Sequence, residues 1–243
     1  MTRGIIRHYI FILSKSVNVK MTLVFSIGIL TFTFISITKE FINMPLFLQK
    51  LGFQSFAFLS VLSFFLFILS TTLQETIINE KITKRLQLLL ANGLPLRDIW
   101  IGASLANFIS NCAIIFFLEA ILVILLKVMK INPFPLFSWT FFIIQLINFP
   151  LLILAFSFLL VKIILIVRRT EIITGILFAS FFLVAFGGSS LFNYLIKKVG
   201  PNGDLFTVNV VVIFTLIEIV LLITAFVFRR RLNVEDVTLS RPE

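Results

Sequence analysis

Long apolar segments separated by short charged segments set the pattern of this 243-residue chain. A helix that crosses a bilayer needs about 20 mainly apolar residues, and six segments meet this requirement. The pattern therefore predicts an all-α integral membrane protein with six transmembrane helices. The predicted spans lie at about 21–37, 53–77, 101–126, 137–164, 172–196 and 206–228.

The fifth predicted span is interrupted by the sequence GGSS at 187–190. We expect this span to end near Phe186 and to be followed by a short re-entrant helix on the outer side, at about 188–198. Irregular backbone at membrane depth is tolerated where protein or water covers it. The interruption therefore predicts a covered, broken helix at the outer leaflet.

The two ends of the chain are predicted to lie outside the transmembrane domain, which covers 21–229. Residues 1–20 mix basic and apolar positions, a pattern typical of a helix that lies along the membrane interface. Residues 230–243 are expected to form a cytoplasmic tail. Alternating the six spans puts 15 Lys and Arg residues on one side and 6 on the other, which together make the 21 in the chain. By the positive-inside rule, the N- and C-termini are both cytoplasmic.

Composition supports the membrane assignment. The chain is 59% hydrophobic and 13% charged, with a mean hydropathy of +1.12, whereas soluble domains have about 25% charged residues. The net charge of +10 is interpreted as basic residues that set the orientation of the chain in the membrane and attract anionic lipid, rather than as a surface that binds nucleic acid. We expect a multi-pass protein of the plasma membrane.

The cytoplasmic segment at about 80–98, between the second and third spans, is rich in leucine and edged with charge. On a continuous helix over 80–93, helical spacing places four apolar residues on one face: Ile82, Leu86, Leu89 and Leu90. The other side carries mainly polar residues: Glu80, Lys81, Lys84 and Gln87. Leu88 lies among these polar residues, where an exposed leucine more usefully meets a protein than water. Periodicity alone gives an ordinary interfacial helix equal weight.

Stop and start signals follow this segment. Asn92 and Gly93 are typical of a helix C-terminus, and Pro95 prevents simple continuation. Asp98 is expected to cap the helix that becomes the third span. The segment is therefore predicted to be a helix, a turn and a re-entry into the membrane.

The residues of this segment resemble the signature between the second and third spans of ABC-2 type membrane (permease) subunits of ABC transporters. The positions that carry the resemblance are Glu80, Leu86, Leu88, Leu89, Leu90, Ala91, Pro95, Leu96, Arg97, Ile99 and Gly102. Six spans with both termini inside also fit the type V exporter-like topology of that family. The sequence departs from the pattern at Ala103, where a lysine often follows the glycine, and in the loose spacing of Asn92 and Gly93 before the proline.

The resemblance implies a division of labour between subunits. The segment 80–98 would be a coupling helix in a groove of a cytoplasmic ABC ATPase subunit, present in two copies. The permease would pair with a second copy of itself or a homologous permease. The residues implied at the ATPase contact are Glu80, Lys84, Arg85, Leu88, Leu89, Arg97, Arg168 and Arg169. For the last two, in the turn after the fourth span, positive-inside anchoring is the alternative.

The chain itself has no G-x-x-x-x-G-K-[ST] loop for binding nucleotide phosphates. We therefore expect no cofactor on this chain, with ATP and Mg on the partner subunit. One cysteine excludes an internal disulfide and a cysteine-rich metal site. The only histidine, His8, lies in the basic N-terminal segment, which excludes a His-based metal cluster or a serine–histidine pair within the membrane. An ATP-driven exporter subunit, rather than an enzyme in its own right, is the preferred interpretation.

Polar residues inside the predicted spans are candidates for a translocation path. A charged residue near the bilayer centre costs about 2.5–3.5 kcal/mol, so such a side chain should face the bundle interior or be protonated. The candidates are Asn107, Asn111, Glu119, Gln145, Asn148 and Glu218. Hydrogen bonding between helices is the alternative role for these residues, and a site for a cationic amphiphile is a third. Lys162 is expected to extend toward the inner interface.

Two further functions remain open at this point. A proton-coupled secondary transporter would use Glu119 and Glu218 as proton carriers, and a non-transporting membrane scaffold would need neither. An adjacent ATPase gene, or its absence, distinguishes the exporter from the secondary transporter. Purification without a nucleotide-binding partner would favour the scaffold. Lipid, drug, peptide and glycan exporters all share the expected layout.

Overall fold

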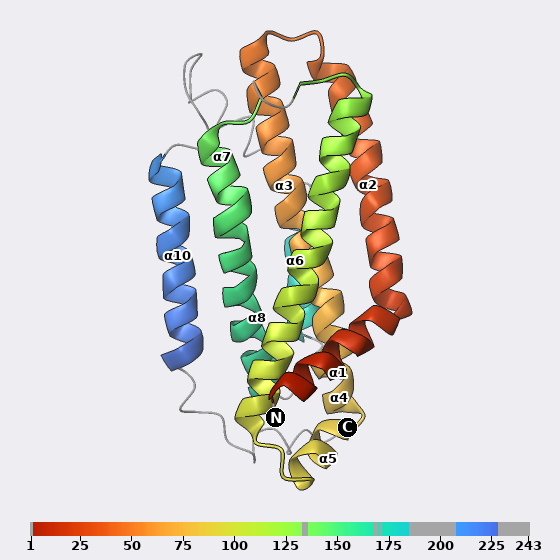
Figure 1. The fold of residues 1–243 in the computed structure, drawn as a ribbon, viewed down its shortest axis with the longest axis vertical. Helices are drawn as coiled ribbons and strands as arrows, with labels where there is room; N and C mark the ends of the chain where they lie inside the picture. Colours follow the sequence, from red (N-terminus) through yellow and green to blue (C-terminus); the bar gives the residue numbers. More distant parts are fainter. Residues whose placement is uncertain (1, 133–135, 168–169, 171, 185–207, 228–243) are drawn as a thin grey trace.

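The computed structural model describes residues 2–132, 136–167, 170, 172–184 and 208–227. Within these ranges the chain is helical and forms a bundle of long helices standing side by side (Figure 1). Among the described residues, four helices are long and apolar enough to cross a membrane: Val17–Phe41, Leu46–Ile82, Leu96–Val128 and Trp139–Ile166. They coincide with the first four predicted spans, as expected for a multi-pass membrane protein.

Figure 1 labels the helical elements, and two of the long helices are made of more than one element because a π-helical segment interrupts them. The π segments η1 and η2 interrupt the second and fourth long helices, and π segments occur frequently at functional sites. The elements are α2 (Val17–Phe41), α3 (Leu46–Leu73), η1 (Gln74–Ile78), α4 (Asn79–Ile82), α5 (Arg85–Ala91), α6 (Leu96–Val128), α7 (Trp139–Ile143), η2 (Ile144–Asn148), α8 (Phe149–Ile166) and α10 (Val208–Val227).

The regions of the fifth and sixth predicted spans are described in part. Shorter apolar helices occupy Ile172–Val184 and Val211–Val227, the latter within α10. The predicted re-entrant helix at 188–198 and the predicted tail at 230–243 lie outside the described residues. The six-span layout therefore stays a prediction.

A separate N-terminal helix, α1 (Thr2–Lys15), crosses the lower end of the bundle obliquely (Figure 1). Its buried residues are Tyr9 and Leu13. Gly102 on α6 allows the close approach of α1, because a Cβ atom at this position would lie 2.5 Å from Cγ2 of Ile5. The chain turns into α2 at Ser16, whose side chain accepts a hydrogen bond from the backbone N–H of Val19.

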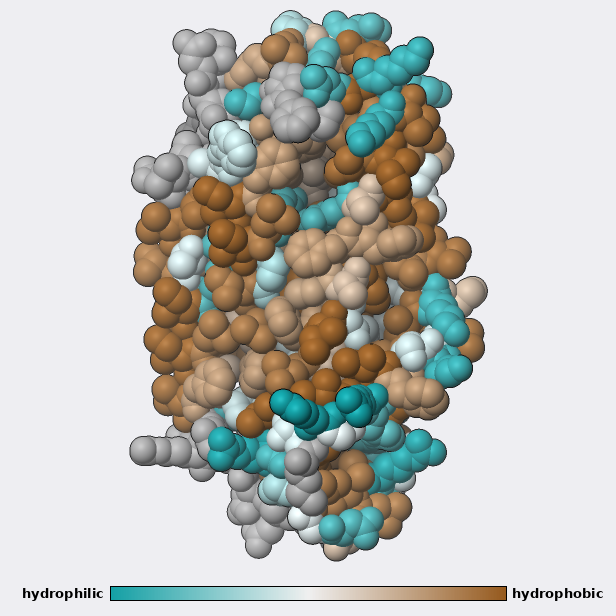
Figure 2. All heavy atoms as spheres, in the orientation of Figure 1, coloured by the Kyte–Doolittle hydropathy of each residue, from teal (hydrophilic) through white to brown (hydrophobic). Residues whose placement is uncertain are grey.

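The outer surface is apolar along most of its height. Figure 2 shows hydrophobic residues over the middle of the bundle and hydrophilic residues gathered mainly toward its two ends. Large apolar side chains of α2 and α10 are exposed, among them Phe32 and Ile223. In a soluble protein such a surface would aggregate, whereas in a membrane it meets lipid.

Candidate functional site

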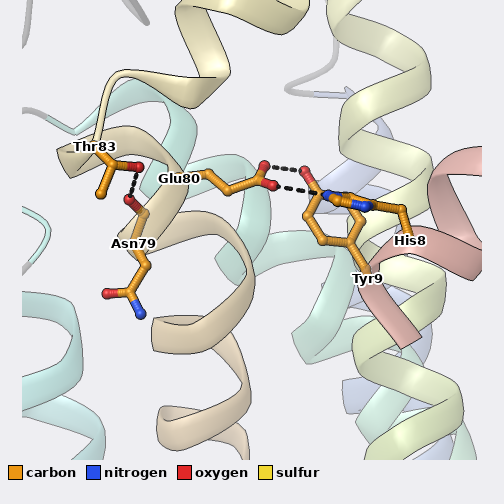
Figure 3. Close-up of polar contacts among 5 residues, drawn as sticks. All are labelled: His8, Tyr9, Asn79, Glu80 and Thr83. Carbon is orange, nitrogen blue, oxygen red and sulfur yellow. Dashed lines mark hydrogen bonds and ion pairs between the residues drawn. The ribbon is translucent and has the colours of Figure 1, made fainter. Parts of the chain in front are cut away.

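The predicted coupling helix over 80–93 is two helices rather than one. The helix α4 ends at Ile82, and Lys84 adopts a left-handed backbone with φ of 60° before α5 begins at Arg85. The Thr83 hydroxyl donates to the carbonyl oxygen of Asn79 at 2.7 Å (Figure 3), which satisfies one free acceptor at the end of α4. The prediction of a continuous helix was therefore wrong, because the helix is interrupted at Thr83 and Lys84.

This break changes which side chains face the bundle. Glu80 and Lys81, expected on the polar side, are each only 4% exposed, and Ile82, expected on the apolar face, is 58% exposed. Those three placements were wrong because the helical phase does not carry across the break. On α5 the prediction holds, since Leu86 is buried and Leu88 is 64% exposed.

Glu80 joins the α4 segment to α1. The Tyr9 hydroxyl donates to Oε2 of Glu80 at 2.6 Å, and Nε2 of His8 lies 3.3 Å from Oε1 (Figure 3). Burial, with a smaller effect from the neighbouring Glu80 carboxylate, raises the pKa of the Tyr9 hydroxyl, so the hydroxyl stays protonated and donates. Glu80, proposed from the sequence as an ATPase contact, thus faces the protein's own N-terminal helix.

Lys81 joins the same segment to α8. Its Nζ donates to three carbonyl oxygens at the end of that helix, those of Ile164 at 2.8 Å, Leu165 at 3.1 Å and Val167 at 2.7 Å. The last carbonyls of a helix have no partner within the helix, and a cation is favoured there. This contact could not be predicted from the sequence, because its acceptors are backbone carbonyl oxygens, which are the same at every residue.

The remaining predicted contact residues lie near the same end of the bundle. Lys84, Arg85 and Arg97 are exposed, and Leu89 is partly buried. Arg168 and Arg169 lie outside the described residues. Asp98 does not cap α6 as predicted, because the N-cap is Pro95 and Asp98 falls within the first turn, where its negative charge is still favourable.

Asn107 and Asn111 form a ladder between α6 and the second long helix. Nδ2 of Asn107 donates to the Thr76 hydroxyl at 2.9 Å, and Nδ2 of Asn111 donates to the Thr72 hydroxyl at 3.0 Å. Each amide also donates to a backbone carbonyl one turn earlier on α6. Both residues are fully buried, so the geometry corresponds to the alternative role of bonding helices together.

Asn148 and Glu218 meet where η2 packs on α10. Nδ2 of Asn148 donates to the Thr215 hydroxyl at 2.9 Å and to Oε2 of Glu218 at 3.2 Å. The Thr215 hydroxyl donates in turn to the carbonyl of Val211 at 2.9 Å, so the Asn148 amide must present N–H to it. The side chain of Glu218 is buried, and its Oε1 accepts no hydrogen bond from any described residue.

Gln145 and Glu119 complete the predicted intramembrane set. Gln145 is buried on η2, one helical turn before Asn148, and its Oε1 also lacks a donor among the described residues. Glu119 is separate from this pair, since it lines a crevice between α2, α3 and α6. The structure therefore brings Asn148 and Glu218 into contact and leaves Glu119 in a different place.

Lys162 does not extend to the interface as predicted. Its side chain is 1% exposed, and its Nζ donates to the carbonyl oxygen of Ala225, in the last turn of α10, at 2.7 Å. The same atom lies 5.4 Å from the centre of the Trp100 ring, a favourable cation–π distance. The prediction was wrong because acceptors and an aromatic face are available inside the bundle.

No protein-family model, curated protein or solved structure matches this chain. Within the described ranges, no group of three or more His, Cys, Asp or Glu residues is placed to hold a metal ion. Two features of the chain itself bear on its function. These are the α4–α5 segment at the end of the bundle and the polar residues buried between the long helices.

Proposed function

We propose that this protein is the transmembrane subunit of an ATP-driven exporter of the ABC-2 type. The observation that carries the proposal is the α4–α5 segment, which presents the exposed Leu88 on a short helix while its base is bonded into the bundle. The resemblance of residues 80–102 to the ABC-2 signature supports the same function. The chain would contribute a translocation path, and a separate ABC ATPase would supply the energy.

The contacts at the base of α5 give a physical route for coupling. A force on α5 reaches α4 through the short connection at Lys84, and α4 is bonded to α1 by Glu80 and to α8 by Lys81. Hydrogen bonds to charged groups contribute about 1.5–3 kcal/mol each. These bonds would therefore transmit a displacement of α5 to two different helices of the bundle.

The proposed assembly contains two six-span subunits and two ATPase subunits in the plasma membrane. The second permease copy, or a homologous permease, would supply the missing wall of the path. ATP and Mg would bind the ATPase subunits. The path residues proposed from the sequence are Asn107, Asn111, Glu119, Gln145, Asn148 and Glu218. Of these, Glu119 and Glu218 each carry a buried carboxylate oxygen without a donor among the residues described.

Leu88→Asp tests the proposal, with Leu46→Asp as its matched control. Both leucines are highly exposed, at 64% and 60%, but Leu46 begins α3 at the opposite end of the bundle, where an acidic residue is favourable. Burying a leucine contributes about 1.5–3 kcal/mol, so Leu88→Asp should reduce the ATPase recovered with the protein in mild detergent by about tenfold or more. Leu46→Asp should leave recovery unchanged.

Two results would count against the proposal. Recovery of the ATPase with Leu88→Asp at the level of the unmodified protein would show that α5 is not the contact. Equal losses of ATPase recovery in the two variants would point to a general effect of an added charge on folding or insertion. Elution of each variant as a single species in size-exclusion chromatography checks that it is folded.

A further inference from the structure

A crevice opens between α2, α3 and α6, away from the α4–α5 segment. Nine residues line it, and seven of them are apolar, including Leu30, Ala57 and Ile115. The two polar residues are Ser60 on α3 and Glu119 on α6. Glu119 is nine residues from the end of α6 at Val128, which corresponds to about 14 Å along the helix. The crevice therefore lies within the apolar height of the bundle, in its predicted outer half.

The Glu119 carboxyl group has unused capacity to accept hydrogen bonds. Its Oε1 is buried and has no partner in the part of the chain that the structure describes. An ionised carboxylate at membrane depth is costly unless a cation or a set of donors compensates it. No Lys or Arg side chain lines the crevice. The Glu119 carboxylate therefore needs a cation or hydrogen-bond donor that the lining residues do not supply.

The dimensions of the crevice restrict that donor. The crevice leaves about 10 Å³ for the centre of a water-sized group, which is room for about one such group. A primary ammonium group is of this size and carries three N–H donors and a positive charge, as in the lysine side chain. A trimethylammonium group is larger and has no N–H. The apolar walls leading to the opening suit a hydrocarbon chain rather than a polar ligand.

We propose that this crevice binds the primary ammonium end of an amphiphile, with the Glu119 carboxylate as its counter-ion and the hydrocarbon chain along the apolar walls. The proposal names a ligand class that the exporter function does not itself require. Binding can be measured without nucleotide or ATPase, so this proposal and the exporter function can fail independently. Ser60 lines the same crevice and would lie beside the bound amphiphile.

Native mass spectrometry of the full chain in detergent tests the proposal, with dodecylamine as the probe. We expect one dodecylamine per chain to bind saturably, and dodecyltrimethylammonium, which has the same chain length, to bind at least about tenfold more weakly. Glu119→Gln removes the counter-ion at nearly constant shape and should weaken dodecylamine binding by about tenfold or more. Glu40→Gln changes an exposed carboxylate near the end of α2, outside the crevice, and should leave binding unchanged.

A second variant keeps the test decisive if Glu119→Gln does not fold. Ser60→Leu leaves the carboxylate in place and fills the crevice with a larger side chain, and because Ser60 is partly exposed its neighbours need not move. It should also abolish the saturable adduct. Any of three results would overturn the proposal: no saturable binding of dodecylamine, equal binding of the two amphiphiles, or full binding by both crevice variants.

Discussion

Replacing Lys81 by methionine would isolate the contact between the α4–α5 segment and α8. Methionine keeps a long unbranched side chain but removes the charge and all three N–H donors. The carbonyl oxygens of Ile164, Leu165 and Val167 would then lose their partner. The bonds to Ile164 and Leu165 are buried, whereas the bond to Val167 is partly buried, so water can replace only part of what is lost.

The size of the effect follows from those two buried acceptors. Leaving a buried acceptor unsatisfied costs about 1–3 kcal/mol, and the lower part of that range applies where a helix end can adjust. The free energy of unfolding should therefore fall by about 2–4 kcal/mol. For a soluble domain of this size such a loss corresponds to a decrease in melting temperature of about 4–16 °C.

Thermal unfolding in detergent measures this effect, with Lys84→Met as the matched control. Lys84 is exposed, three residues from Lys81, and an exposed substitution of this kind changes stability by less than about 0.5 kcal/mol. If the protein is the proposed exporter subunit, Lys81→Met should also lower the transport obtained per ATP hydrolysed. A Lys81→Met variant as stable as Lys84→Met would refute the assignment of Lys81 as the link to α8.

Three further predictions concern other buried contacts. The pKa of the Tyr9 hydroxyl is raised in the folded protein, so the unfolded chain releases this proton first as the pH rises. The contribution of Tyr9 to stability is therefore full below about pH 10 and falls above it. Tyr9→Phe should remove this fall, which a pH series of melting temperatures checks. Gly102→Ala should lower the free energy of unfolding by about 1–3 kcal/mol, because the added Cβ meets Ile5. Gly28→Ala adds a Cβ that meets nothing within 4 Å and should leave stability unchanged. Similar melting temperatures for the two variants would contradict the close packing of α1 on α6. Lys162→Met should lower the unfolding free energy by at least about 1.5 kcal/mol in denaturant titrations, whereas a change below about 0.5 kcal/mol is the result for a lysine that reaches the interface.

The positions of the first four long helices could be read from the sequence, because length and apolar composition alone decide whether a helix suits the bilayer. The exposed Leu88 was also predictable, since it interrupts a polar face within one helix. The helix break at Lys84 was not predictable, because a lysine with positive φ has no sequence signal such as glycine provides. The periodicity argument therefore failed for Glu80, Lys81 and Ile82, which lie before the break.

The partners of the buried lysines were also beyond sequence reasoning. Lys81 and Lys162 both donate to backbone carbonyls near the ends of other helices. A backbone acceptor has the same chemistry at every residue, so no pairing of charged residue types reveals it. The meeting of Asn148 with Glu218 was partly predictable, since both are polar residues within apolar segments, but their contact depends on how α10 packs against η2.

The most direct test of the exporter function is the identity of the proteins that purify with the unmodified chain from native membranes in mild detergent. The exporter proposal predicts equimolar recovery of an ABC ATPase that carries a G-x-x-x-x-G-K-[ST] loop, in a complex of two permease and two ATPase subunits. Purification of the chain free of any nucleotide-binding protein, at a stage where its own oligomer is intact, would contradict the proposal.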